Sequence, residues 1–128
     1  MLRRRQAQHV ELAVFRVSPQ VLDLPGVVIS DGNASSKYTR FAPAPGGLSI
    51  VDRDMVFAEY WTHPDDIIAE WRHKSIKCAE VLVPDQVNPN LIVGAYVSCE
   101  ESAGTIREHF SSVGASLEAS IDRHLFFL

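Results

Sequence analysis

The sequence predicts a protein of the α+β class, and two observations lead to that class. Short apolar runs bounded by Pro, Gly and Asn indicate strands, and capping residues followed by helix-spaced apolar positions indicate helices between them. We expect a split, mostly antiparallel sheet with flanking helices. The expected strands cover residues 10–17, 27–30, 78–83, 91–98 and 121–127.

The first strand, 10–17, carries apolar side chains on both of its faces, so we expect both faces to be buried. Ser18-Pro19 then begins a short helix to about Leu24, with Ser as N-cap and Pro in the first helical position. Pro25-Gly26 ends this helix before the strand 27–30.

Residues 31–49 are rich in Gly, Asn, Ser and Pro and predict no regular element. A flexible surface connection is one interpretation. However, irregular segments of this length are uncommon in compact domains unless they are functional. This one carries Lys37, Tyr38, Arg40 and Phe41, and such mixtures of cations and rings hold phosphates and stack on unpaired bases.

Two helices are expected next, over residues 52–61 and 65–71. Asp52 is the predicted N-cap of the first. In the second, Ile67, Ile68 and Trp71 share one face, and we expect this face to point inward, with Trp71 as a core anchor.

The strand 78–83 contains one acid, Glu80, among small, β-branched and aliphatic residues. A carboxylate in such a strand loses hydration and needs a partner. Basic residues precede it in what we expect to be a loop, which suits a site that binds an anion and handles a proton. The alternative is a glutamate at a strand edge that faces solvent. The basic residues are Arg72, His73, Lys74 and Lys77.

The C-terminal part predicts a strand, 91–98, followed by a helix to about Ser112. Ser98-Cys-Glu-Glu101 matches a capping box for this helix, and Gly114 is its predicted stop. A last strand, 121–127, closes the chain.

Composition bounds the function. With 128 residues, 46% hydrophobic and 22% charged, the chain predicts a single domain with a disordered start over residues 1–8. Its net charge of −4 argues against bulk nucleic-acid affinity but allows a local basic groove. The spacing of Cys78 and Cys99 predicts no metal site. We expect a cytoplasmic protein without membrane association, since no apolar run reaches the length of a span.

Several separated blocks of the sequence resemble the C-terminal part of the DarT family, in residues, order and spacing, over roughly residues 9 to 110. DarT enzymes are the toxins of DarT–DarG systems, use NAD to ADP-ribosylate bases in single-stranded DNA, and share the fold of ADP-ribosyltransferases. The blocks are Val28-Ile-Ser-Asp-Gly-Asn-Ala34, Tyr38-Thr-Arg-Phe41, Ile50-Val-Asp52, Tyr60-Trp61 and Lys77-Cys-Ala-Glu-Val-Leu-Val83.

The resemblance implies an ADP-ribosyltransferase-like fold, NAD as co-substrate, single-stranded DNA as the substrate, and a DarG-like macrodomain antitoxin as a partner. It implies that Glu80 is catalytic. Cys78 stands where the family usually has Gln. The residues implied to contact DNA are Lys37, Tyr38, Thr39, Arg40, Lys74 and Lys77.

The family's N-terminal segment, with its Tyr-His motif and catalytic arginine, has no counterpart before His9, so we expect a partial domain over residues 1–128. Three hypotheses follow. The chain is a DNA ADP-ribosyltransferase that is truncated or completed by another polypeptide, or it is an inactive remnant that binds DNA or antitoxin. The third is a small α+β interaction module. From the chain alone we expect little transfer from NAD.

Overall fold

The computed structural model of the protein describes residues 8–128, which form two compact units. One unit contains Asn88–Leu128 with the residues up to Ser18, and the other is Pro19–Val87. In chain order the elements are β1 (Val14–Val17), the 3-10 turn η2 (Pro19–Asp23), β2 (Val28–Ser30), β3 (Phe41–Pro43), η3 (Gly46–Ile50), α1 (Arg53–Phe57), α2 (Ile67–Ile76), β4 (Glu80–Leu82), η4 (Pro89–Leu91), β5 (Ile92–Val97), α3 (Glu100–Ser112), β6 (Glu118–Ile121) and η5 (Arg123–Phe126).

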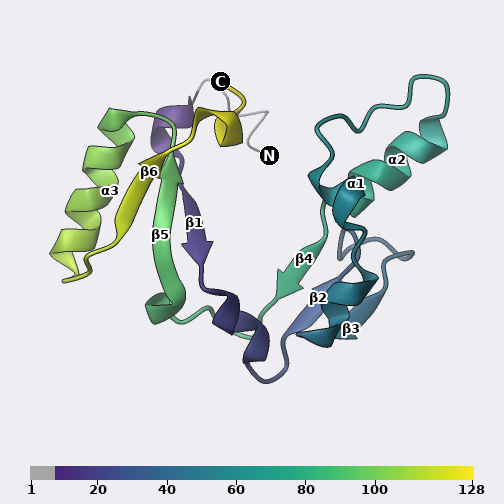
Figure 1. The fold of residues 1–128 in the computed structure, drawn as a ribbon, viewed down its shortest axis with the longest axis horizontal. Helices are drawn as coiled ribbons and strands as arrows, with labels where there is room; N and C mark the ends of the chain where they lie inside the picture. Colours follow the sequence, from purple (N-terminus) through teal and green to yellow (C-terminus); the bar gives the residue numbers. More distant parts are fainter. Residues whose placement is uncertain (1–7) are drawn as a thin grey trace. The chain divides into compact units, whose positions relative to one another are not determined.

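The unit that contains both ends of the described chain is built on a three-stranded sheet of order β1-β5-β6 (Figure 1). β1 is antiparallel to β5, whereas β5 and β6 are parallel and are joined through α3. α3 lies along this sheet, and between them Val97, Ala103 and Ala119 form a buried apolar cluster. Ala13 and Ile106 pack against the cluster from its margin.

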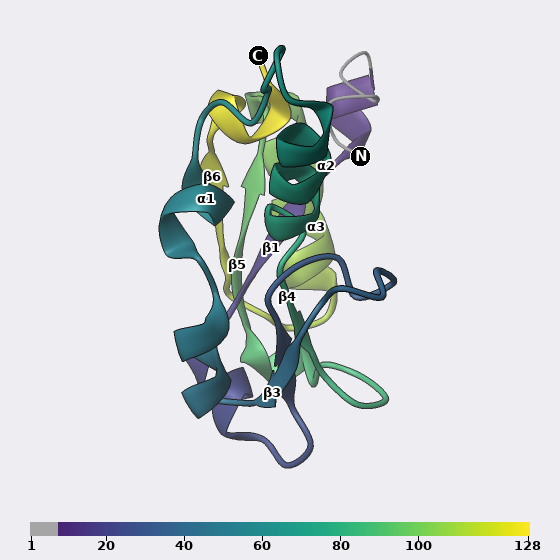
Figure 2. The same cartoon turned by 90° about the vertical axis from the view of Figure 1, so that its right-hand side faces the viewer.

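The unit Pro19–Val87 is built on a second three-stranded sheet, of order β3-β2-β4, in which both pairs are antiparallel. The central strand β2 holds buried Ile29 and Ser30. Within this unit, both views place α2 beyond the end of the sheet at which β2 ends and β4 begins (Figures 1 and 2). The two sheets and the helices confirm the mostly antiparallel α+β class.

The first predicted strand is too long, because β1 begins at Val14 rather than at residue 10. Residues 8–11 form a 3-10 turn, and two hydroxyl groups use carbonyl oxygens that a longer strand would need. Ser98 Oγ donates to the His9 carbonyl at 3.2 Å, and Ser102 Oγ donates to the Val10 carbonyl at 2.8 Å. The expected burial of both faces is also wrong, because Phe15 is exposed.

Two predictions around α3 need correction. The capping box is wrong: the N-cap position falls on Cys99, and the Ser98 hydroxyl lies 2.7 Å from His9 Nδ1 instead. The last strand is Glu118–Ile121, and the chain then turns at η5, where Asp122 Oδ1 accepts from the His124 N–H at 3.0 Å. Gly114, with φ of 71°, ends the helix as predicted.

In the other unit, Asp52 caps α1 as predicted, with its Oδ1 accepting from the Met55 N–H at 3.0 Å. The strand β3 was not predicted, because Pro43 interrupts its pattern; β3 is an edge strand of its sheet and tolerates proline at its end. The helix α2 runs on to Ile76, so the expected basic loop at residues 72–74 is helical.

The inward face predicted for α2 is wrong. Ile67, Ile68 and Trp71 are 61%, 72% and 62% exposed, so Trp71 is not a core anchor. Among the described residues, no helix is long and apolar enough to cross a membrane. The prediction of a disordered start over residues 1–8 falls outside the described residues except at residue 8.

Candidate functional site

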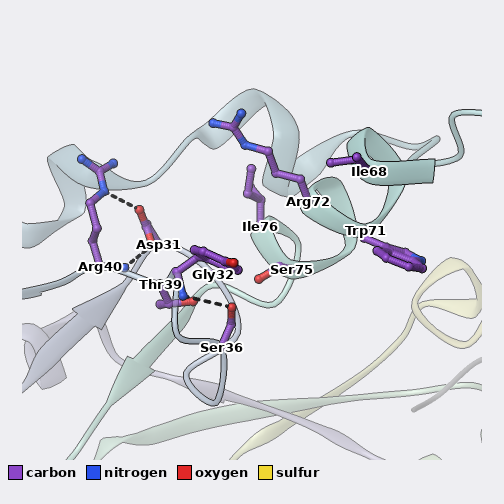
Figure 3. A pocket seen from close by; sticks show the side chains of 11 residues that line it. Asp31, Gly32, Ser36, Thr39, Arg40, Ile68, Trp71, Arg72, Ser75 and Ile76 are labelled. Carbon is purple, nitrogen blue, oxygen red and sulfur yellow. Dashed lines mark hydrogen bonds and ion pairs between the residues drawn. The ribbon is translucent and has the colours of Figure 1, made fainter. Parts of the chain in front are cut away.

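A cleft of about 780 Å³ lies within the unit Pro19–Val87, between the segment after β2 and the helix α2 (Figure 3). Asp31 and Arg40 lie at one end of the cleft in this view, and Ile68 and Trp71 lie at the other. The lining residues are Asp31, Gly32, Ser36, Tyr38, Thr39, Arg40, Ile68, Trp71, Arg72, Ser75 and Ile76.

Hydrogen bonds fold the segment 31–40 onto the C-terminal half of α2. Asn33 Oδ1 accepts from the N–H and the hydroxyl of Ser35, and the Thr39 hydroxyl donates to the Asn33 carbonyl at 2.6 Å. The Asn33 N–H donates to the Ser75 carbonyl at 2.9 Å. At Gly32 a Cβ would lie 3.0 Å from Ser75 Oγ, so the close approach to α2 favours glycine there. These bonds hold the segment in a defined conformation, so that it forms one wall of the cleft rather than a flexible surface connection.

An ion pair fixes one end of the cleft. Asp31 accepts two hydrogen bonds of 2.8 Å from Arg40, one from its backbone N–H and one from Nε. Burial alone would raise the pKa of Asp31. The hydrogen bonds from Arg40 and its positive charge together outweigh this effect, so the pKa lies below its ordinary value. Asp31 is therefore a carboxylate at neutral pH, and it orients the exposed guanidinium of Arg40.

Aromatic rings and cations share the open surface of the cleft. The Tyr38 side chain is 83% exposed, and Lys37 Nζ lies 5.1 Å from the centroid of its ring. Trp71 and Arg72 enter the lining from α2. Exposed rings can stack on unpaired bases, while the neighbouring cations can neutralise phosphates. The cleft therefore has the chemistry of a single-strand binding surface.

Glu80 lies at the start of the edge strand β4 and is exposed. The buried strand predicted around it is wrong, because its neighbour Val81 is exposed as well. The backbone N–H of Glu80 donates to Ser30 Oγ at 3.0 Å, which fixes the strand, and the carboxylate is not part of the cleft lining. The environment differs from the prediction, whereas the catalytic role stays a prediction.

The residues predicted to contact DNA divide into two groups. Tyr38, Thr39 and Arg40 line the cleft, and Lys37 adjoins it through Tyr38. The other two lie away from the lining: Lys74 Nζ is 4.7 Å from the Trp61 ring centroid, and Lys77 Nζ donates to carbonyl groups at the C-terminal end of α1.

The structure adds residues that the sequence analysis did not assign to the site. Ile68, Trp71, Ser75 and Ile76 line the cleft, although Ile68 and Trp71 were expected to point into the core. The basic residues after Trp71 could have indicated that the helix continues beyond Trp71, because cations are favoured in the last turn of a helix. Among residues 8–128, no group of three or more His, Cys, Asp or Glu side chains could hold a metal ion.

The fold and the cleft define a mostly antiparallel α+β protein with a ring- and cation-lined site. A family model described as "ssDNA thymidine ADP-ribosyltransferase, DarT" matches residues 1–127. The chain belongs to this DarT family. No curated protein matches the chain.

Solved DarT structures share the fold. The DarTG protein of Thermosipho africanus in complex with ADP-ribose is 27% identical, with a TM-score of 0.74, over 100% of this chain and 33% of that one. The DarT of Thermus sp. 2.9 in complex with carba-NAD+ is 19% identical, with a TM-score of 0.76, over 89% of this chain and 57% of that one.

The same Thermus DarT in complex with ADP-ribosylated single-stranded DNA is 19% identical, with a TM-score of 0.75, over 89% of this chain and 54% of that one. The chain thus spans between 33% and 57% of the length of these structures, which is less than two thirds.

Proposed function

We propose that these 128 residues are the DNA-binding and glutamate-bearing part of an enzyme that transfers ADP-ribose from NAD+ to a thymidine base of single-stranded DNA. The observation that carries the proposal is the cleft itself, which is lined by both aromatic rings and cations on a chain of the DarT family. The solved DarT complexes with carba-NAD+ and with ADP-ribosylated DNA support the same pair of substrates.

In the proposed complex, Tyr38 and Trp71 stack on unpaired bases, and Arg40 and Arg72 contact the phosphates between them. Single-stranded DNA is the fitting substrate, because a paired base hides the atom that would be modified. Asp31 holds the Arg40 guanidinium in place before DNA binds, which lowers the entropy lost on binding.

Fluorescence anisotropy with a labelled thymidine-containing oligonucleotide tests this binding. We expect single strands to bind more tightly than the matching duplex, with an affinity that falls as salt rises. Tyr38→Ala and Arg40→Ala should each lower the affinity about tenfold. Arg123→Ala, in the other unit and exposed, is the matched control. Unchanged binding by both cleft variants would remove the cleft from the proposal.

For catalysis we assign Glu80. As nicotinamide leaves NAD+, the ribose carbon to which it was bonded becomes cationic. A nearby carboxylate stabilises that charge and accepts the proton lost by the attacking base nitrogen. Since Glu80 is exposed in the described chain, the substrates themselves must exclude water from it for this stabilisation to be large.

Mass spectrometry of the oligonucleotide after incubation with NAD+ tests this role in the protein expressed from the full reading frame that contains these residues. Glu80→Gln should reduce the rate at least about a hundredfold while binding DNA normally. Glu118→Gln, an exposed glutamate of β6, is the matched control and should be fully active. A Glu80→Gln enzyme of normal rate would refute the assignment.

The same assay on the protein of the full reading frame distinguishes the second hypothesis, since little transfer is expected from these 128 residues alone in either case. DNA binding with no transfer from NAD+ by that protein would favour a non-catalytic DNA-binding form. We further propose a toxin role in the cytoplasm with a DarG-like antitoxin as partner, supported by the similarity to the Thermosipho DarTG protein. Co-purification with the product of an adjacent macrodomain gene tests that partner, and separate elution of the two would count against it.

A further inference from the structure

The helix α2 has two functional faces. One face supplies Ile68, Arg72 and Ile76 to the cleft, at spacings of one turn. His73 and Lys77 are also one turn apart but point to the other side, where they contact α1 and the segment that follows it. The position of the cleft wall therefore depends on what holds α2 from behind.

His73 is the one buried side chain within α2, at 5% exposure. Its Nε2 lies 2.8 Å from the Met55 carbonyl oxygen, and its Nδ1 lies 3.1 Å from His63 Nε2. A carbonyl oxygen only accepts, so Nε2 must carry a hydrogen. In the neutral ring Nδ1 is then the acceptor, and His63 Nε2–H donates to it.

Lys77 adds a second attachment. Its Nζ donates to the Val56 carbonyl at 3.0 Å and to the Ala58 carbonyl at 2.6 Å, where the C-terminal end of α1 presents unpaired oxygens. None of the side chains of α1 is buried. Hydrogen bonds from His73 and Lys77 therefore join α2 to α1 and the residue that follows it, and the bond from His73 depends on the protonation of histidine.

We propose that His63, His73 and Lys77 form a proton-sensitive latch that positions α2, with His73 as a positioning residue for the cleft. With one added proton the hydrogen bond between the two rings is kept, because either ring can donate to the other. Two added protons place N–H groups opposite each other across 3.1 Å. The latch is therefore closed while at most one of the two rings carries an added proton, and it opens when both rings are protonated.

The elements around the pair also carry charged side chains. The described contacts place the rings of His63 and His73 against each other. The other titratable and charged side chains on the elements that pack here, namely α1, the segment before α2 and α2 itself, are Asp52, Arg53, Asp54, Glu59, Tyr60, Asp65, Asp66, Glu70, Arg72, Lys74 and Lys77.

The effect of the latch on DNA affinity rests on the proposed function, and its pH dependence is opposite to the one expected from charge alone. Protonated histidines add positive charge, so single-strand binding to an invariant surface tightens or stays level as pH falls. The latch predicts the reverse, because opening it displaces the wall that carries Trp71 and Arg72. Affinity for an oligothymidine should fall about tenfold between about pH 7.5 and about pH 5.5.

His73→Gln is the decisive variant, since its amide can donate to the Met55 carbonyl and accept from His63 but cannot gain a proton. Amide hydrogen exchange reports the latch without DNA. In the unmodified chain, protection of the α2 amides, corrected for intrinsic rates, should fall about tenfold over the same pH range. In His73→Gln it should stay level, and His73→Ala should be poorly protected at every pH. His109→Gln, in α3, is the matched control and should follow the unmodified chain.

Equal pH dependence of protection in the unmodified chain and in His73→Gln would overturn the latch. DNA affinity that rises in acid in the unmodified chain would overturn its effect on the cleft. A chain that shows the latch in hydrogen exchange but binds no oligonucleotide at any pH would sink the proposed function and leave the latch intact.

Discussion

Within residues 8–128, the two longer helices are held in place in different ways. α3 packs Ala103 and Ile106 onto its sheet, against Val97 and Ala119, so apolar contact fixes it. α2 buries only His73 and exposes its large apolar residues. Apolar packing involves no titratable group and is insensitive to pH, whereas hydrogen bonds of titratable side chains respond to it.

This difference separates a helix that buries apolar side chains from one that exposes them. Ile68 and Trp71 stay in water, and exposed apolar side chains that gather in a patch often mark a binding surface. Helices of this kind are drawn from the less stable parts of proteins, because binding segments must be free to adjust. Substitutions in the apolar cluster beneath α3 and in the cleft beside α2 test this difference.

The largest expected effect comes from Val97→Asp. Val97 is 0% exposed, and a carboxylate there has no partner in the apolar cluster. We expect a loss of about 4 kcal/mol or more in the free energy of unfolding, measured by urea denaturation. Val113→Asp is the control, because that side chain is 76% exposed and the change should stay within about 0.5 kcal/mol. Similar losses in both variants would contradict the apolar account of α3.

Trp71→Ala should have an intermediate effect, on binding rather than on stability. The free energy of unfolding should change by less than about 0.5 kcal/mol, since the ring is exposed. Affinity for single-stranded DNA should fall about tenfold through the loss of one stacking platform. Phe57→Ala, on α1 and 77% exposed, removes a ring outside the cleft lining and should bind normally. A Trp71→Ala protein that is clearly destabilised would mean that α2 depends on packing after all.

The smallest expected effect is that of Asp31→Asn. Because the pKa of the folded carboxyl lies below its ordinary value of 3.8, its stabilising contribution is present above that value and is lost as pH falls through the folded pKa. At neutral pH the substitution should cost under about 1 kcal/mol, since Arg40 is largely exposed.

Urea midpoints of the unmodified and Asp31→Asn chains should therefore differ at about pH 7 and converge at about pH 2. Asp23→Asn, at an exposed position, is the control and should show no such convergence. A difference that persists unchanged in acid would exclude the ion pair as its source.

The sequence by itself determined the elements whose causes are local. Asp52 caps α1 and Gly114 ends α3, because a side-chain acceptor and a left-handed backbone act within a few residues. The central positions of β2 and β5 followed from their apolar runs. The motif blocks indicated the DarT family and drew attention to Tyr38, Thr39 and Arg40, which line the cleft.

The tertiary structure decided which faces are buried and which carbonyl groups are already used. The apolar stripe of Ile68 and Trp71 has the spacing of a core face, and only the position of α2 beyond the sheet end leaves it in water. The first strand is short because the hydroxyl groups of Ser98 and Ser102 arrive from far along the chain. Contacts between distant residues leave no periodic trace in a sequence, so burial and hydrogen-bond partners at these positions emerge only on folding.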